Sequence, residues 1–446
     1  MTMNTLERLR SGQLAGTRRL KLACGLQDFP REIFDLADTL EILDLSGNAL
    51  SQLPADLPRL KNLRILFCSD NQFTELPAVL GQCPQLVMIG FKANQIQTVP
   101  GTALPAALRW LILTDNQIQE LPADIGRCTR LQKLMLAGNQ LQALPPSLAA
   151  CTQLELLRIS ANQLTELPQF LLALPKLSWL AYAGNSFCES TERTALTGTP
   201  ITHIPWERLT LAQPLGEGAS GVIHQAQWHH SKGVQPVAVK LFKGEVTSDG
   251  LPQNEMTACL RAGAHAHLIP VLGQVADHPE GVRVMVMALI NPAFCNLAGP
   301  PSLDSCTRDI YAADTCFDLA TVLRMAQGIA SVARHLHAQG LMHGDLYAHN
   351  ILHGGQGRAL LGDFGAASFL ALQDRPQAHA LQRLEVRAYA CLLEELLERC
   401  AAPADSHATL AALTGLKAAC LQEEAHARPL FHEIEQVLMN LASPDL

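Results

Sequence analysis

The sequence has no long hydrophobic run, no signal peptide and no excess of positive charge. Its apolar stretch at Val284–Ile290 is far shorter than a bilayer requires, and residues 1–16 contain no apolar segment. A net charge of −8 argues against nucleic acid as the main partner. These absences predict a soluble, cytoplasmic protein without a membrane span.

Metal-binding and disulfide patterns are also missing. The thirteen cysteines include no Cys-x-x-Cys pair, so a disulfide framework is not expected. Five histidines lie between residues 335 and 353, but none forms His-Glu-x-x-His or a Cys/His spacing typical of zinc. With 48% hydrophobic and 17% charged residues over 446 positions, the chain is expected to form two ordered domains.

The first half of the chain is a repeat array marked by regularly spaced asparagines. They stand 22 or 23 residues apart, at Asn48, Asn71, Asn94, Asn116, Asn139, Asn162 and Asn185. Each lies in the pattern Leu-x-x-Leu-x-Leu-x-x-Asn-x-Leu, and a Leu-Pro or Val-Pro pair follows most of them. Residues 17–188 therefore resemble the leucine-rich repeat family. The resemblance implies about seven stacked repeats behind a degenerate N-terminal cap.

Two features of the repeats carry structural predictions. Alternate leucines of a short strand face inward, and each asparagine satisfies backbone groups of the turn that follows it. Cysteines that stand three residues before a repeat's first leucine read as small buried hydrophobes; they are Cys83, Cys128 and Cys151.

The residues beside each central leucine are expected to point onto the concave face. One such column is apolar in six of seven places: Ile42, Ile65, Met88, Trp110, Lys133, Leu156 and Trp179. An exposed apolar stripe of this length favours a protein partner, with the chain's own second domain among the candidates. Strand propensity alone is the alternative explanation of the column.

The second half contains four strings in an order typical of Mg-ATP phosphoryl transfer. Gly216–Val222 is a glycine-rich turn between strand patterns, and Val237-Ala-Val-Lys240 follows as an alternating strand. Further on come His343-Gly-Asp345 with Asn350, and then Asp363-Phe-Gly365. From Pro205 onward the chain resembles the protein kinase family, in particular its tyrosine-kinase-like branch.

The resemblance implies roles for the charged residues. Asp345 accepts or orients the proton of the acceptor hydroxyl, while Asn350 and Asp363 bind the metal. Lys240 holds the α and β phosphates, and Glu255, fifteen residues on in a helical pattern, orients it. A surface lysine and a solvated helix face are the alternative interpretations of this pair.

The resemblance also implies a nucleotide-binding set. The phosphates are covered by Gly216, Glu217, Gly218, Ala219, Ser220, Gly221 and Val222. Val222, Ala238 and Leu352 enclose the adenine, Met287 is the gatekeeper, and Leu289 lies in the hinge. ATP and Mg²⁺ are the implied cofactors.

The chain departs from the family pattern around the activation segment. Gly344 replaces the usual arginine before the catalytic aspartate, and the segment from Gly365 to Glu385 is short and lacks Ala-Pro-Glu. Ser368 is its only hydroxyl residue, so no phosphorylation switch is expected there. Arg428, which the family pairs with the missing glutamate, needs another partner. Residues 291–316 form a longer loop than usual, without an assigned role.

The sequence thus predicts an α/β leucine-rich-repeat solenoid, residues 1–198, followed by an α+β bilobal protein-kinase-like domain, residues 199–446. The expected function is an ATP- and Mg-dependent protein kinase, serine/threonine because that class is the commoner one, with a repeat domain that binds proteins. A catalytically weak kinase-fold scaffold is one alternative. A small-molecule kinase is another, because His-Gly-Asp-Leu346 resembles the catalytic loop of aminoglycoside and choline kinases.

Overall fold

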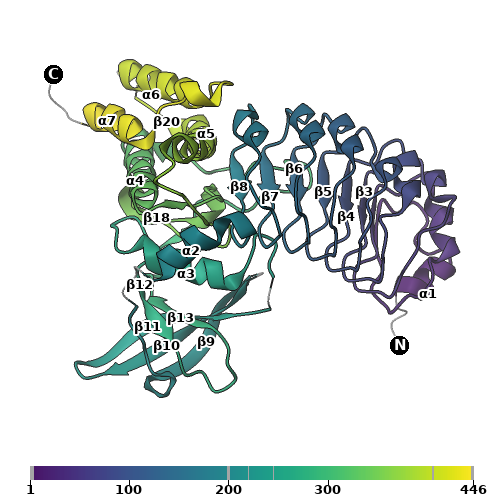
Figure 1. Cartoon of the computed structure of the whole chain (residues 1–446), viewed down its shortest axis with the longest axis horizontal. Helices are drawn as coiled ribbons and strands as arrows, with labels where there is room; N and C mark the ends of the chain where they lie inside the picture. Colours follow the sequence, from purple (N-terminus) through teal and green to yellow (C-terminus); the bar gives the residue numbers. More distant parts are fainter. Residues whose placement is uncertain (1–4, 198–200, 219, 245, 404–405, 443–446) are drawn as a thin grey trace. The chain divides into compact units, whose positions relative to one another are not determined.

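The computed structural model describes residues 5–197, 201–218, 220–244, 246–403 and 406–442 (Figure 1). The chain divides into two compact units. The first comprises residues 1–176 with 185–187, and the second comprises residues 177–184 with 188–446. The strand of the last repeat, β8 (Trp179–Ala181), is therefore part of the second unit. The domain boundary after residue 198 remains a sequence-based prediction.

The first unit begins with a short helix, α1 (Thr5–Arg10), and continues as a parallel sheet of three-residue strands. These strands are β1 (Arg19–Lys21), β2 (Ile42–Asp44), β3 (Ile65–Phe67), β4 (Met88–Gly90), β5 (Trp110–Ile112), β6 (Lys133–Met135) and β7 (Leu156–Arg158). Equivalent residues of successive repeats pair in register, as Ile42 with Ile65 and Ile65 with Met88. The 23-residue spacing of the sequence therefore sets the sheet register.

Each strand is followed by a turn and then by a short 3-10 helix. The 3-10 helices are η1 (Arg31–Leu36), η2 (Leu57–Arg59), η3 (Ala78–Gln82), η4 (Gly101–Ala103), η5 (Ala123–Arg127), η6 (Pro146–Ala150) and η7 (Gln169–Ala173). Pro77, Pro100 and Pro122 each stand directly before such a helix, where the missing N–H is not needed. Leucines of the strands and helices fill the core between them.

The repeat asparagines bridge neighbouring repeats, as the sequence predicts. Asn116 is buried; its Nδ2 donates to the carbonyl oxygens of Phe91 at 2.9 Å and Leu113 at 3.0 Å, and its Oδ1 accepts from the N–H of Ile96 at 3.0 Å. The residue before each asparagine adopts a positive φ, for example 58° at Asp115. The side-chain amide thus satisfies backbone groups that the tight turn leaves without a strand partner.

Replacing Asn116 by leucine is expected to lower the free energy of unfolding of the first unit by about 1–3 kcal/mol for each buried backbone group left without a partner. Chemical denaturation of the full chain, followed by a probe in the repeats, measures the loss. Gln117→Leu is the matched control, because the Gln117 side chain is exposed. Equal stability of the two variants would contradict the bridging role.

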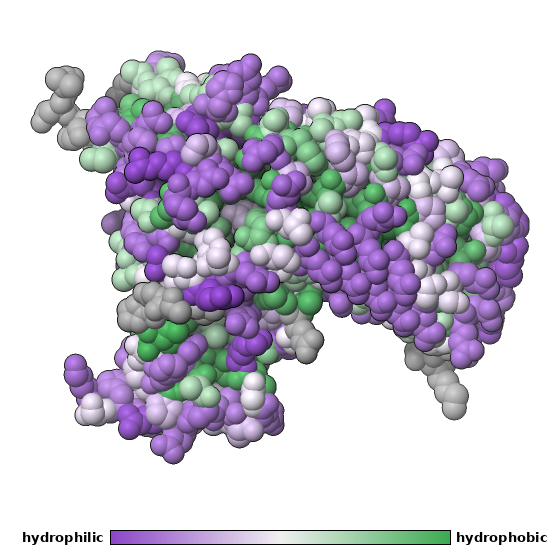
Figure 2. Space-filling model, viewed as in Figure 1, coloured by the Kyte–Doolittle hydropathy of each residue, from purple (hydrophilic) through white to green (hydrophobic). Residues whose placement is uncertain are grey.

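The concave column is less exposed than the sequence suggests. Ile65 and Met88 retain only 6% and 2% of their exposure, so strand packing already covers much of this column. In the view of Figure 2, hydrophobic residues gather over the repeat strands and hydrophilic residues flank them. Cys83, Cys128 and Cys151 are buried, which confirms their interpretation as hydrophobic filling.

The second unit has an antiparallel sheet and a helical part. The sheet runs β12 (Val271–Val275), β13 (Val284–Ala288), β11 (Gly233–Phe242), β10 (Gly221–His230) and β9 (Leu209–Gly218). Alternating residues such as Val237, Val239 and Val286 fill its core. Two helices accompany it, α2 (Glu189–Thr197) and α3 (Pro252–Ala262), which lie side by side (Figure 1).

The helical part is built around α4 (Leu319–Ala338) and α5 (Arg375–Glu398), with α6 (His407–Cys420) and α7 (Phe431–Ala442) beyond them. The Asp318 carboxylate caps α4 by accepting the Thr321 N–H at 2.6 Å. The Tyr389 hydroxyl of α5 donates to the Ala326 carbonyl of α4 at 3.1 Å. The buried apolar residues of α4 recur at steps of three and four, as at Val322, Ala326, Ile329 and Ala333.

Short strand pairs position the loops between these helices. They are β14 (Cys295–Asn296) with β17 (Ile351–His353) and β18 (Ala359–Leu361), β15 (Phe317–Asp318) with β20 (Cys400–Ala401), and β16 (Leu341–Met342) with β19 (Ser368–Phe369). Among the described residues, no helix is long and apolar enough to cross a membrane. The sheet followed by helices agrees with the predicted α+β bilobal fold.

Candidate active site

The glycine-rich turn joins β9 and β10. Gly216, Glu217 and Gly218 end β9, and Gly221 and Val222 begin β10. Ser220 precedes β10, whereas Ala219 lies outside the described residues. A Cβ on Gly221 would stand 2.3 Å from the Leu241 carbonyl oxygen of β11. Glycine at this position therefore allows the turn to lie close to the strand that carries Lys240.

Lys240 of β11 contacts the Glu255 carboxylate of α3, the partner expected from the sequence. Both side chains are buried. Burial lowers the pKa of Lys240, but the charges of Glu255 and Asp363 outweigh it and hold the pKa above its ordinary value. Lys240 is thus a fixed ammonium group facing two carboxylates.

A cavity of about 140 Å³ brings the phosphate-binding candidates together. Its lining consists of Gly218, Ser220, Gly221, Ile223, Lys240, Thr247, Asp249, Asp363 and Gly365. Asp363 stands more than a hundred residues after the glycine-rich turn and Lys240 in the chain, and the fold brings the three together. They surround one space with a cation on one wall and a carboxylate on another.

The catalytic-loop candidates are joined by hydrogen bonds. The Asn350 amide Nδ2 donates to the Asp345 carboxylate at 2.8 Å and to the Asp345 carbonyl oxygen at 3.0 Å. His343 Nε2 lies 2.9 Å from the Gly362 carbonyl oxygen, which ties this loop to the residue before Asp363. Asp363 has a φ of 54° and accepts the Gly365 N–H at 3.1 Å. The loop and the Asp-Phe-Gly turn thus hold each other.

Glu385 of α5 also holds the catalytic loop, residues 343–350. Its carboxylate, 1% exposed, accepts the Gly344 N–H at 2.8 Å and lies 2.7 Å from His337 Nε2. Burial raises the pKa of Glu385, but His337, with smaller contributions from His343 and the Gly344 N–H, brings it below the ordinary value. Glu385 is therefore an ionised support of the catalytic loop.

The adenine candidates lie on the neighbouring strands. Ala238 of β11 pairs directly with Met287 of β13, and Leu289 follows the end of β13. Val222 and Leu352 belong to β10 and β17 and are both partly exposed. Their enclosure of an adenine ring remains a prediction.

The long loop 291–316 contributes a residue that sequence reasoning missed. The Asp309 carboxylate, fully buried, accepts the His349 N–H at 3.0 Å and lies 2.7 Å from His349 Nδ1. The loop is fixed to α5 by Arg308, whose Nε donates to Glu395 at 2.9 Å. No periodic pattern marks Asp309, and its partner stands 40 residues further along the chain.

The Asp309–His349 pair introduces a pH-dependent contribution to stability. Burial lowers the pKa of His349, but Asp309, and more weakly Asp345 and Asp363, raise it above the ordinary value. A histidine with a raised pKa contributes fully below its unfolded pKa of about 6.5 and loses its contribution as the pH rises through the folded-state value.

Asp309→Asn is therefore expected to reduce stability by about 1.5–3 kcal/mol at pH 6, the usual range for a hydrogen bond to a charged group. The loss should shrink towards pH 9, as the pH rises through the folded-state pKa of His349 and the imidazole loses its charge. Thermal unfolding at the two pH values measures it, with the exposed Asp314→Asn as control in the same loop. A loss independent of pH would show that the imidazole is not charged.

Arg428, left without its family partner, is held by backbone oxygens. Its guanidinium donates to the carbonyl oxygens of Gln422 at 2.8 Å and Arg383 at 3.2 Å. Burial lowers the pKa of Arg428 to about 10. Main-chain oxygens thus accept hydrogen bonds from Arg428, whose family partner is missing.

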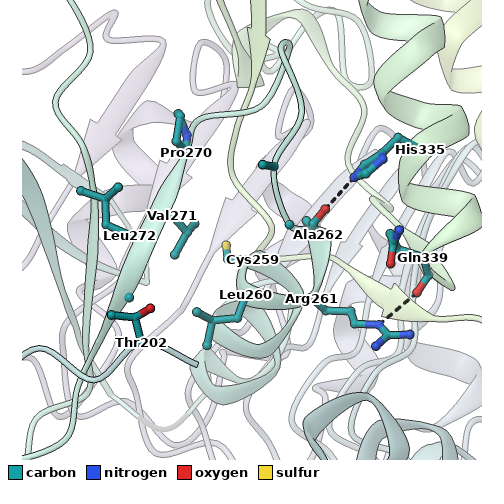
Figure 3. A pocket seen from close by; sticks show the side chains of 13 residues that line it. Thr202, Cys259, Leu260, Arg261, Ala262, Pro270, Val271, Leu272, His335 and Gln339 are labelled. Atoms are coloured by element: carbon teal, nitrogen blue, oxygen red, sulfur yellow. Dashed lines mark hydrogen bonds between the residues drawn. The ribbon is translucent and has the colours of Figure 1, made fainter. Parts of the chain in front are cut away.

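A second cavity, of about 430 Å³, lies between α3, β12 and α4 (Figure 3). Two hydrogen-bonded pairs belong to its lining. His335 Nε2 stands 2.7 Å from the Ala262 carbonyl oxygen, and Arg261 Nε donates to the Gln339 carbonyl oxygen at 3.3 Å. None of the nucleotide-site candidates lines this cavity. Among the described residues, no group of three His, Cys, Asp or Glu side chains is arranged to hold a metal ion.

Three family models match the chain. Residues 209–394 match the protein tyrosine and serine/threonine kinase family. Residues 106–164 and 39–60 match two leucine-rich repeat models.

Similar proteins are kinases of both hydroxyl classes. An Ack-related non-receptor tyrosine kinase of Caenorhabditis elegans is 30% identical over 38% of this chain and 15% of its own length. Fibroblast growth factor receptor 1 of Pleurodeles waltl is 28% identical over 39% of this chain and 23% of its own. Serine/threonine-protein kinase A-Raf of Mus musculus is 27% identical over 37% and 24%.

The chain thus spans less than a quarter of the length of these relatives. The repeat models cover β2 and β5 to β7, and the kinase model covers the glycine-rich turn, Lys240, the catalytic loop and the Asp-Phe-Gly turn. This protein carries leucine-rich repeats followed by a protein kinase domain.

Proposed function

We propose that this protein transfers the γ-phosphoryl group of ATP to a hydroxyl group of a protein, with Mg²⁺ as cofactor. The observation that carries the proposal is the Lys240–Glu255 pair facing Asp363 across the small cavity under the glycine-rich turn. Asp345 and Asn350, hydrogen-bonded to each other, complete the set. A scaffold without catalysis would have no need for Lys240, Asp345, Asn350 and Asp363 together.

Each residue has a role that its surroundings support. The Lys240 ammonium, kept charged by Glu255, binds the α and β phosphates. The Asp345 carboxylate, positioned by the Asn350 amide, orients the acceptor hydroxyl and accepts its proton. The backbone of Gly216–Gly218 and Gly221 covers the phosphates, and Val222, Ala238, Met287, Leu289 and Leu352 contact the adenine.

The residues present also fit the metal. The Asn350 Nδ2 is engaged with Asp345, which leaves the amide oxygen as a possible ligand, and the Asp363 carboxylate lines the phosphate cavity. Oxygen ligands of this kind suit Mg²⁺. When bound, Mg²⁺ neutralises charge on the phosphate oxygens. We propose Asn350 and Asp363 as its protein ligands.

The acceptor class is the finer part of the proposal. We propose serine or threonine, with the repeats selecting the protein partner through their concave face and the reaction occurring in the cytoplasm. The relatives include both serine/threonine and tyrosine kinases. The short stretch between Gly365 and α5, residues 366–374, favours a small-molecule acceptor as the second candidate, because little chain is left there to bind a peptide.

Incubation of the purified full chain with γ-labelled ATP and Mg²⁺ tests the proposal. The expected result is label on a generic protein substrate or on the chain itself, with acid-stable phosphoserine or phosphothreonine after hydrolysis. Label found only on an added small hydroxyl compound would favour the second candidate. No transfer under any condition, with ATP still bound, would support the scaffold alternative.

A further inference from the structure

The last repeat strand contacts the catalytic loop of the kinase unit. Trp179 of β8 is 1% exposed, and its indole stacks on the Tyr347 ring with centroids 4.1 Å apart and planes 7° from parallel. The indole Nε1–H donates to the Leu346 carbonyl oxygen at 3.1 Å. Leu346 and Tyr347 directly follow Asp345, so one side chain from the repeats holds both residues next to the proposed proton acceptor.

Tyr182, the residue directly after β8, contacts the segment that follows Asp363-Phe-Gly365. The Tyr182 N–H donates to the Ser368 hydroxyl, and the Tyr182 hydroxyl donates to the Phe369 carbonyl oxygen, both at 3.0 Å. Burial raises the pKa of Tyr182 far above its ordinary value, so this hydroxyl keeps its proton. Ser368 is itself fully buried. The β16–β19 strand pair is thus extended by contacts from a third segment.

Gly344 makes the close approach possible. Its φ is 73°, and a Cβ at this position would stand 2.8 Å from the Leu180 carbonyl oxygen and 2.4 Å from that of Ala366. The backbone of β8 therefore occupies the space that a side chain at position 344 would need. Arg387 of α5 adds a further tie by donating to the Ser178 hydroxyl at 2.7 Å. The glycine that departs from the family pattern is the one the strand requires.

Helix α2 continues these contacts to α3. The Glu192 carboxylate accepts the Gly184 N–H at 2.7 Å and the Asn254 side-chain amide at 3.5 Å. Asn254 is the neighbour of Glu255, the partner of Lys240. One stretch of chain, residues 177–197, thus contacts the catalytic loop, the strand after the Asp-Phe-Gly turn and the helix that orients the lysine.

We propose that β8 is a working part of the catalytic unit and takes the place of an activation segment, with Trp179 and Tyr182 as positioning residues for Asp345 and for the turn at Asp363. The inference rests on the proposed phosphoryl transfer. Because the contacts of β8 involve no group that must be phosphorylated, the folded chain holds the active arrangement permanently.

The test compares Trp179→Ala with Trp206→Ala, which removes a half-buried indole of the same unit that takes no part in these contacts. Trp179→Ala is expected to lower kcat at least tenfold, about 1.4 kcal/mol in the barrier, and to change KM for ATP less than twofold. Trp179→Phe, which keeps an aromatic ring on Tyr347, should recover most of kcat, and Trp206→Ala should stay within twofold of wild type. Equal kinetics of the two alanine variants would overturn the inference.

Hydrogen exchange separates this inference from the proposed function. Trp179→Ala should speed exchange of the backbone amides of residues 343–350 and 366–369, whether or not the wild type transfers phosphate. Tyr182→Phe removes a single hydroxyl and should speed exchange at 366–370 even if Trp179→Ala does not fold. Unchanged exchange in Tyr182→Phe, or in a folded Trp179→Ala, would overturn the role of β8, whereas absent transfer by the wild type would overturn only the enzymatic proposal.

Discussion

Asp363→Asn is expected to reduce phosphoryl transfer by about 100- to 1,000-fold, the loss usual for removing one preorganised group that stabilises charge in a transition state. The Asp363 carboxylate lines the phosphate cavity and faces Lys240. An asparagine keeps the shape of the side chain and still accepts the Gly365 N–H, so the Asp-Phe-Gly turn should be retained. Steady-state transfer from labelled ATP measures the effect, and circular dichroism checks the fold.

Asp314→Asn serves as the control for this variant, since Asp314 is exposed and distant in sequence from the site. It should transfer phosphate at the wild-type rate. Near-normal transfer by Asp363→Asn would remove the metal-binding assignment and with it the main support for Mg-ATP chemistry.

Lys240→Met is expected to abolish transfer and also to destabilise the second unit by about 3–5 kcal/mol, because it leaves a buried carboxylate without its cation. The sequence alone leads one to expect a variant that keeps its stability. The structure corrects this, since Glu255 is only 3% exposed. Burial already raises the pKa of Glu255. A carboxyl whose pKa is raised by folding contributes less to the stability of the protein as the pH rises. The loss of stability in Lys240→Met should therefore be larger at pH 8 than at pH 5.

The double variant Lys240→Met/Glu255→Met distinguishes the two effects. Replacing a whole buried ion pair by apolar side chains of similar volume is often neutral or stabilising. The double variant should therefore recover most of the lost stability while remaining inactive. If the double variant is as unstable as Lys240→Met, the unpaired Glu255 carboxylate is not the cause of the lost stability.

The regular parts of the chain could be predicted because each rests on a short-range pattern. The asparagine spacing alone gives the repeat register, and the interrepeat hydrogen bonds of Asn116 follow from it. The apolar positions of α4 recur at three- and four-residue steps, which specifies its buried face. The order of the four kinase-like motifs, together with the helical pattern around Glu255, predicts that Lys240 pairs with Glu255. Both residues lie on the expected strand and helix.

The contacts that the sequence did not reveal join segments far apart and have no periodic signal. Trp179 and Trp110 occupy equivalent positions of their repeats, so periodicity predicts the same surroundings for both. Only the fold distinguishes them, because the partners of Trp179 stand 167 and 168 residues later in the chain. The role of Asp309 could not be predicted for the same reason, because the composition of its loop does not indicate a buried carboxylate.

The distance in sequence between β8 and its partners has a consequence for synthesis of the chain. Each repeat asparagine bonds backward to residues already made, as Asn116 does to Phe91 and Ile96, so the repeats can fold one after another as they leave the ribosome. Trp179 and Tyr182 can instead form their hydrogen bonds only after residues 346 and 369 have been synthesised. At about 5–20 residues per second this delay is on the order of ten seconds. Two aromatic side chains at the end of a finished array are then open to chaperones or to other nascent chains.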